Sequence, residues 1–181
     1  MKIEVPKSKA SRLVNPGEVI LVSSAYKDKS NIITLAWHMP ISKDPALLGI
    51  AVAKSHFSYE LIKESEEFII NIPGFDILKE VIFCGSTTGR KADKFKESNL
   101  SAAKAERLIK TPVIKECLGH IECSLSDVKD IGDHGLFIGE VIYAAAEKDL
   151  FGEAWHIDKA KLIFHFGGAL FTTNAEKLDI S

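Results

Sequence analysis

Cysteine is scarce in this chain of 181 residues, and its three cysteines make an odd number. A disulfide framework needs paired cysteines in an oxidising compartment, so we expect reduced thiols and a cytoplasmic location. No apolar run approaches the ~18 residues that a membrane-spanning helix requires, so we expect no membrane partner. The first residues also lack the apolar core of a secretory leader, and we expect none.

An excess of charge of one sign is missing as well. The formal net charge is −2 at pH 7, whereas nucleic-acid binding needs a basic surface, so we expect no nucleic-acid partner. The hydrophobic content of 46% and the charged content of 27% are ordinary for a soluble globular protein. The length fits one domain with a substantial core, and we expect a single domain over 1–181.

Familiar catalytic patterns are absent too. We find no nucleophile elbow, no paired carboxylates and no glycine-rich dinucleotide fingerprint. Cys117, His120 and Cys123 have the spacing of metal ligands, but a strand would turn His120 away from both cysteines. No fourth ligand is near, so we expect core cysteines and no metal. An enzyme with this sequence would need an external cofactor for its chemistry.

Short apolar runs with the two-residue period of strands are what the sequence does contain. Helical periodicity is confined to 58–65 and 76–84, where Asp76 is a candidate cap. Many strands with short helices between them predict a mostly β fold, a small antiparallel β-barrel. The strands are expected over 18–26, 29–38, 46–53, 67–72, 118–125, 136–145 and 161–166.

The strand expected over 29–38 has an unusual composition. It carries polar residues and a large aromatic where a plain core strand would carry only aliphatics. Together with 18–26 and a polar turn it predicts a β-hairpin that presents Asn31, Thr34 and Trp37 to a ligand. A flat heteroaromatic molecule needs hydrogen-bonding groups at its edge and apolar contact on its faces. The composition therefore predicts a ligand of this kind.

A turn between an expected strand and an expected helix is suited to a phosphate. Lys54, Ser55 and Ser58 would supply a cation and two hydroxyls there, beside the free N–H groups of the helix start. The alternative is that Ser55 or Ser58 merely caps the helix.

A second loop, 84–89, is rich in glycine, serine and threonine and precedes three cations, Arg90, Lys91 and Lys94. Glycine lets a backbone approach a ligand closely, and the cations would offset a negative charge. A solvated surface loop is the alternative. Two such turns in one small chain favour a phosphate-bearing ligand more than either does alone.

His134 lies in a glycine-flanked turn, 131–135, between two expected strands. An imidazole there could reach a ligand or relay a proton, and a plain turn histidine is the alternative. His165, between Phe164 and Phe166, is expected to point outward from its strand.

Taken in order along the chain, these pieces resemble the flavin reductase-like family, in its flavoredoxin and archaeal ferric reductase branch of FMN-binding split barrels. Thr88-Gly89-Arg90 stands where the family often has Ser-Gly-Arg, and it keeps the hydroxyl. The resemblance covers about Pro16 to Glu140. It rests on Pro16, 19–22, Asn31, Thr34, Ala36-Trp37, Pro45, Ser55, Ser58, 67–73, Cys84-Gly85, 88–90, 93–95, Pro112, Glu122-Cys123, 132–134 and 139–141.

The resemblance implies a Greek-key antiparallel split barrel that forms a homodimer with one non-covalent FMN per subunit. The strand from Asn31 to Trp37 would run along the isoalloxazine, and the two turns would hold the phosphate. His134 would lie on the substrate side, and no catalytic residue is assigned beyond that candidate. The expected cofactor-binding residues are Asn31, Ile32, Ile33, Thr34, Ala36, Trp37, Lys54, Ser55, Phe57, Ser58, Thr87, Gly89, Arg90 and Lys94.

The expected function is that of a flavin-dependent oxidoreductase of the flavin or ferric reductase type. NAD(P)H or another donor, a small molecule or a protein, would reduce bound FMN, and free flavin, ferric complexes or a protein would accept the electrons. The alternative is a non-enzymatic FMN-binding electron carrier without NAD(P)H activity of its own. A split barrel that has lost its flavin, and is structural or binds haem, is disfavoured by the presence of both turns.

Overall fold

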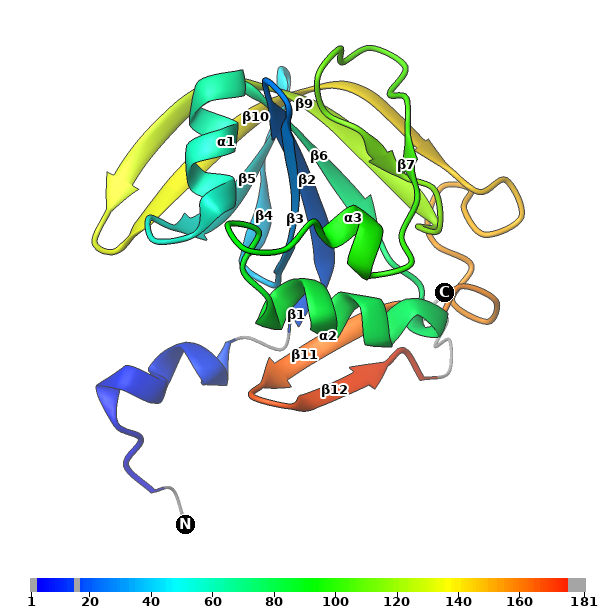
Figure 1. Cartoon of the computed structure of the whole chain (residues 1–181). Helices are drawn as coiled ribbons and strands as arrows, with labels where there is room; N and C mark the ends of the chain where they lie inside the picture. Colours follow the sequence, from blue (N-terminus) through cyan, green and yellow to red (C-terminus); the bar gives the residue numbers. More distant parts are fainter. Residues whose placement is uncertain (1–2, 15–16, 176–181) are drawn as a thin grey trace.

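A seven-stranded antiparallel sheet dominates the computed structural model, which describes residues 3–14 and 17–175 (Figure 1). Its strand order is β3-β2-β6-β9-β10-β5-β4. The two edge strands, β3 and β4, are consecutive in the chain, so Ala36 and Trp37 close the sheet into a barrel. At this seam the Ala51 N–H donates to the Trp37 carbonyl at 2.9 Å. The strands are β2 (Ile20–Tyr26), β3 (Lys29–Leu35), β4 (His38–Lys43), β5 (Ala46–Ala53), β6 (Glu67–Ile72), β9 (Gly119–Ile131) and β10 (His134–Ala146).

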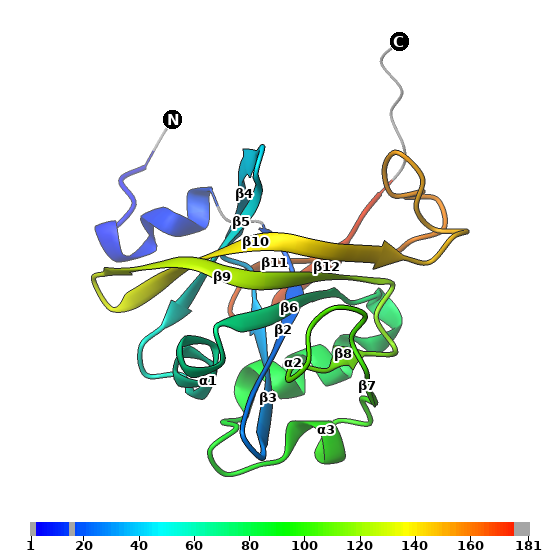
Figure 2. The same ribbon diagram turned by 90° about the horizontal axis from the view of Figure 1, so that it is seen from above.

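Smaller elements surround this barrel. Figure 2 shows η1 on one side of the long β9–β10 ribbon, and α1, α2 and α3 on the other. None of the helices in the described residues has the length and apolar character to cross a membrane. The further strands are β1 (Gly17–Glu18), β7 (Ala102–Ala103), β8 (Val113–Ile114), β11 (Ile163–Gly167) and β12 (Leu170–Thr173); the helices are η1 (Lys7–Leu13), α1 (Phe57–Ser65), η2 (Phe75–Ile77), α2 (Leu78–Ser86) and α3 (Lys94–Glu97).

The first three residues of strand β2 are aliphatic and the next two, Ser23 and Ser24, are small, because both faces of the strand are buried. Ile20 and Val22 point into the barrel core, whereas Leu21 joins a second core under α2. Since successive side chains of a strand point to opposite faces, a strand between two cores has consecutive apolar residues where both cores are apolar, as at Ile20–Val22. Val81 of α2 and Ile163 of β11 complete the second core, so α2 packs between the barrel and the three-stranded sheet β1-β11-β12.

The mostly β, antiparallel fold predicted from the sequence is confirmed, and β5 and β6 have the predicted bounds. The predicted hairpin is also confirmed, with β2 and β3 paired from Ile20–Leu35 to Tyr26–Lys29. The prediction that Asp76 caps a helix is wrong: it lies within η2, and α2 begins after Ile77 without a side-chain cap. Pro16, part of the family resemblance, lies outside the described residues.

A fully buried carboxylate holds one of the long loops to the barrel. Glu122 of β9 has no exposed surface, yet its oxygens accept the N–H groups of Glu106, Arg107 and Leu108 at 2.7, 2.9 and 2.8 Å. Burial raises the pKa of Glu122, but the three N–H donors outweigh it, and the pKa lies below its ordinary value. The charge is therefore satisfied by backbone rather than by a cation. Glu67 of β6 accepts two further N–H groups of the same loop, from Lys110 and Thr111.

The substitution Glu122→Ala is expected to lower the free energy of unfolding by about 3 kcal/mol, because three buried N–H groups lose their acceptor. Urea unfolding at pH 7 measures this loss. Glu140→Ala is the matched control, since Glu140 is an exposed carboxylate on the neighbouring strand β10, and it should change the stability by less than about 0.5 kcal/mol.

The same pair of variants tests the pH dependence. Because the folded-state pKa of Glu122 is lowered, its stabilisation is complete above the ordinary carboxylate pKa of about 4.3. It is lost as the pH falls through the lower folded value. Unfolding of Glu122→Ala should therefore vary less between pH 5 and pH 3 than unfolding of the unaltered protein. Identical pH profiles would contradict this assignment.

Candidate functional site

Three of the predicted cofactor residues meet at one buried point. Asn31 of β3 is 3% exposed, and its Nδ2 donates to Ser58 Oγ of α1 at 2.9 Å. Its Oδ1 is buried and accepts no hydrogen bond. The loop between α2 and α3 lies against this oxygen at Gly89, where an added Cβ would overlap Asn31 Oδ1. Glycine is therefore required at position 89 for the close approach of the loop.

The start of α1 has no side-chain cap. Its N-cap residue is His56, and no side chain bonds to the free N–H groups there. Ser58 is fully buried and engaged with Asn31, while Ser55 is exposed. The capping alternative for Ser55 and Ser58 is therefore wrong. The N–H groups of His56 and Tyr59 bond to backbone carbonyls, so those of Phe57 and Ser58 remain available to an anion. Lys54, beside them, lies with its Nζ 3.6 Å from Asp130 Oδ2 of the β9–β10 hairpin.

Lys94 lies elsewhere than the sequence pattern suggested. Its side chain is 3% exposed, and its Nζ donates to the carbonyls of Ile32 and Cys84 at 2.6 and 2.7 Å. Burial lowers the pKa of Lys94. Thr34 is fastened similarly, because its Oγ1 donates to the Val81 carbonyl at 2.7 Å. Both polar groups join β3 to the helices that cover it.

Arg90 lies at the surface and is held by a carboxylate. Its guanidinium donates two hydrogen bonds to Glu60, at 3.0 and 2.5 Å, and lies 5.2 Å from the centre of the Phe57 ring. The Lys29 ammonium lies 5.9 Å from the same ring. Because the ion pair is exposed, it contributes little to stability, and another anion could replace Glu60.

Three cations of this region, Lys29, Arg90 and Lys91, line one hollow of about 490 Å³, which we call the cationic hollow. Its lining combines the β2–β3 turn with the loop after α2, so the two segments face a common space. Its lining residues are Asp28, Lys29, Ser30, Phe57, Gly89, Arg90, Lys91, Ala92 and Asp93.

A second hollow, of about 440 Å³, lies at the seam between β3 and β4, and we call it the central hollow. Trp37, 45% exposed, forms part of its wall, with its ring centre 5.0 Å from that of His134 and the planes tilted by 31°. The hollow has both apolar and hydrogen-bonding walls. It is lined by Ser8, Ser11, Arg12, Thr34, Leu35, Ala36, Trp37, Ala51, Ala53, His56, His134, His165 and Gly167.

His134 is oriented by its neighbour in the β9–β10 turn. Its Nδ1 donates to Asp133 Oδ1 at 2.7 Å, and this hydrogen bond, with the charge of the imidazole, lowers the pKa of Asp133. An ionised carboxylate only accepts, so Nδ1 carries the proton and Nε2 is left for a ligand. The pKa of His56, in the same hollow, is lowered by burial and by the charges of His134 and Lys94.

Helix η1 and the β11–β12 hairpin form a wall of the central hollow that the sequence did not predict. Arg12 of η1 lies against Gly167, whose φ of +112° and close approach both favour glycine. His165 lines the hollow too, with its ring centre 4.7 Å from that of Phe171. The sequence pattern gives little indication that these segments meet, because they are about 150 residues apart and η1 has no buried residue.

The remaining predicted residues differ in what they can offer. Ile32 and Ile33 have 0% and 6% exposure and fill the two cores, so only their backbone could meet a ligand. Ala36 lines the central hollow. Thr87 is the C-cap of α2, and its N–H donates to the Phe83 carbonyl.

Comparison with known proteins adds the family context. The sequence model of the protein family described as "Flavin reductase like domain" matches residues 11–170 of this chain. An uncharacterized protein from Archaeoglobus fulgidus is 34% identical over 151 residues, which cover 83% of this chain and 84% of that protein.

Two solved structures share the fold. The flavoredoxin from Methanosarcina acetivorans matches with a TM-score of 0.89 at 26% identity, over 100% of this chain and 95% of that chain. The flavoredoxin of Desulfovibrio vulgaris (Miyazaki F) matches with a TM-score of 0.87 at 22% identity, over 100% and 97%.

The substitution Lys94→Met is expected to lower the free energy of unfolding by about 2 kcal/mol without any ligand, because two buried carbonyls lose their donor. Lys91→Met is the control, since Lys91 is exposed, and it should change the stability by less than about 0.5 kcal/mol. Urea unfolding of both variants measures the difference. Equal stability of the two variants would show that Lys94 does not fasten β3.

Proposed function

We propose an FMN-dependent redox function for this chain, which belongs to the flavin reductase-like family. FMN would be bound non-covalently and would supply the redox chemistry, taking electrons from NAD(P)H or another donor and passing them to free flavin, a ferric complex or a protein acceptor. The residues of the chain would bind the cofactor, orient it and control access to it.

The meeting of Asn31, Ser58 and Gly89 is the observation that carries this proposal. Asn31 Oδ1 is a buried acceptor without a donor, and the cradle around it has no room for a Cβ on Gly89. A buried acceptor without a donor is costly, and a ligand hydroxyl is one group that would satisfy it. The ribityl chain of FMN is rich in hydroxyls, so these residues fit the middle of the cofactor.

The central hollow fits the ring system. Its 440 Å³ lie within the ~300–1,000 Å³ typical of small-molecule sites. Trp37 and Ala36 offer apolar contact, and the backbone of β3 offers groups to the polar edge of the ring. His134, with Nε2 left free by Asp133, is the residue that we propose for the substrate side, where it could hold or donate a proton.

The phosphate would lie at the start of α1 and in the cationic hollow. Lys54, Ser55 and the free N–H groups of the helix start form one side. Arg90 forms the other side, and the phosphate would compete with Glu60 for its guanidinium. We propose Arg90 as the cation of this loop that meets the phosphate, because the two bonds of Lys94 to carbonyls commit it to the fold.

The likeness to the Methanosarcina acetivorans flavoredoxin favours a second candidate, an electron carrier that holds FMN but has no NAD(P)H activity. The two candidates share every binding residue and differ only in the donor. The homodimer and the cytoplasmic location remain predictions from the sequence.

The substitution Arg90→Gln is expected to weaken FMN binding about tenfold, because one charge-assisted contact to the phosphate is lost. Glu60→Gln should strengthen it, because the competing carboxylate is removed. Fluorescence titration with FMN, and in parallel with riboflavin, measures both effects. Riboflavin lacks the phosphate, so neither change should alter its affinity.

Arg107→Gln is the matched control, because Arg107 is an exposed arginine of the loop held by Glu122. It should leave both affinities unchanged. Equal weakening of FMN and riboflavin by Arg90→Gln would place the phosphate elsewhere. No uptake of either flavin by the unaltered protein would refute the proposed function itself.

Anaerobic mixing of the FMN-loaded protein with NADH or NADPH separates the two candidate functions. We expect one of the two nucleotides to bleach the flavin absorbance within seconds. A flavin that stays oxidised with both nucleotides, but is bleached by dithionite, would identify the carrier instead. Free FMN under the same conditions is the control for uncatalysed reduction.

A further inference from the structure

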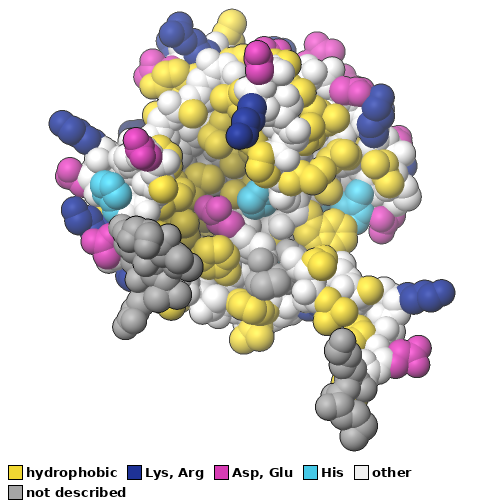
Figure 3. Space-filling model, turned by 180° about the vertical axis from the view of Figure 1, so that it is seen from behind, with side chains coloured by type: hydrophobic (Ala, Val, Ile, Leu, Met, Phe, Trp, Pro, Cys, Tyr) yellow, Lys and Arg dark blue, Asp and Glu magenta, His cyan; other side chains and the backbone are white. Residues whose placement is uncertain are grey.

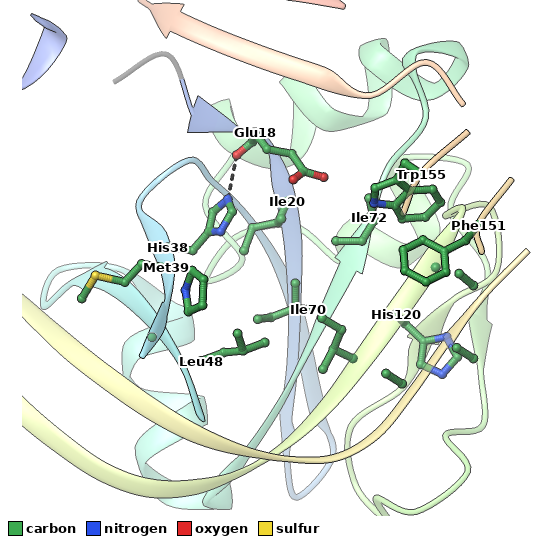
Figure 4. Close-up of a pocket in the computed structure, with 17 residues that line it drawn as sticks. Glu18, Ile20, His38, Met39, Leu48, Ile70, Ile72, His120, Phe151 and Trp155 are labelled. Carbon is green, nitrogen blue, oxygen red and sulfur yellow. Dashed lines mark hydrogen bonds between the residues drawn. The ribbon is translucent and has the colours of Figure 1, made fainter. Parts of the chain in front are cut away.

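A third hollow opens on the back of the molecule and shares no residue with the central hollow or the cationic hollow. Figure 3 shows it as a depression among hydrophobic side chains, with acidic and histidine side chains beside it. Its volume is about 450 Å³, and we call it the back hollow. Ile20, Ile70 and Ile72 of the barrel core form part of its wall, as Figure 4 shows. The hollow is therefore an open part of the barrel interior.

A buried carboxyl oxygen without a donor lies in this hollow. Glu18 of β1 lines it, and its Oε1 is buried without a hydrogen bond. In Figure 4 the carboxyl group lies on the side of the hollow where Ile72 and Trp155 are. Burial raises the pKa of Glu18, and the charge of His38 partly offsets this effect. Such a group is costly to keep unless something pairs with it.

Two imidazoles also line the back hollow. His38 Nε2 donates to the Glu18 carbonyl at 2.8 Å. His120 Nε2 is buried without a hydrogen bond, 3.6 Å from Glu122 Oε1. At 3.6 Å the two atoms are too far apart for a hydrogen bond, so Glu122 does not satisfy His120. The polar atoms of the hollow are thus few, and two of them lack a partner.

The other walls are apolar, and small residues make the space. Phe151 and Trp155 meet edge to face, with ring centres 5.1 Å apart and planes at 78°. Gly49, Gly119 and Ala145 also line the hollow and take up little of its space. At Gly119 an added Cβ would lie 2.9 Å from the Ala145 carbonyl oxygen, so the strands are closely packed there. A flat ring could lie against the aromatic pair in this space.

We propose that the back hollow binds a small uncharged aromatic molecule whose single N–H or O–H group donates to Glu18 Oε1. The carboxyl group disfavours an anion, and the apolar walls disfavour a molecule that is polar all round. The site is separate from the flavin site that we propose. Trp37 lines the central hollow and His38 lines the back hollow, so two adjacent residues at the seam face different hollows. The inference does not rest on the proposed function.

Indole and 1-methylindole are matched probes for this site, because they share the ring and only indole has the N–H. Calorimetric titration of the unaltered protein should give an affinity for indole about tenfold higher than that for 1-methylindole, because only indole forms the buried hydrogen bond. Glu18→Leu should remove this preference, and Glu18→Gln, which keeps an acceptor oxygen, should retain it. If Glu18→Leu does not fold, the two probes on the unaltered protein and on Glu18→Gln still decide.

A filled site provides the second test. Ala145→Phe should abolish binding of both probes and leave FMN binding unchanged, with folding checked by circular dichroism. Equal affinity of indole and 1-methylindole, or no binding of either, would overturn the proposal. Displacement of indole by FMN would assign the probe to the central hollow and overturn it as well. Loss of a dimer in Ala145→Phe, without probe binding to the unaltered protein, would identify the hollow as an interface between copies.

Discussion

The fastening of β3 by a buried lysine is the interaction on which the site depends. β3 is an edge strand of the seven-stranded sheet, and the outer groups of an edge strand need partners from outside the sheet. Lys94 Nζ bridges the carbonyls of Ile32 and Cys84 and so joins β3 to the end of α2. The loop between these two contacts must then pass over β3, which brings Gly89 onto Asn31. The cradle is a consequence of this packing.

Buried charges in this molecule are satisfied mostly by backbone groups. Lys94 donates to carbonyls, whereas Glu122 and Glu67 accept N–H groups of one loop. Several backbone dipoles directed at one side chain hold the loop or strand that carries them in place. Glu18 is different, because one of its oxygens has no partner among the described residues. This contrast distinguishes a polar group that serves the fold from one available to a ligand.

The seam between β3 and β4 joins two spaces of different chemistry. On one side the central hollow combines Trp37 with His134 and Arg12, which suits a ring that carries polar edges. On the other the back hollow is apolar and ends at Glu18. Ala36 and Trp37 join the two edge strands directly, so no further strand covers the seam. Both hollows can therefore open beside it.

The sequence by itself determined six of the seven barrel strands, because the period of their apolar residues is a local property, whereas β4 (His38–Lys43) was not predicted. The bounds of β5 and β6 were predicted correctly, and the polar residues Asn31 and Thr34 were recognised as unusual in their strand. Only the tertiary structure decided how each polar group is used. Lys94 and Arg90 look alike in sequence, yet one is buried against two carbonyls and the other pairs with Glu60 at the surface. Burial and pairing depend on partners tens of residues away, such as Ile32 for Lys94, and no local pattern encodes them.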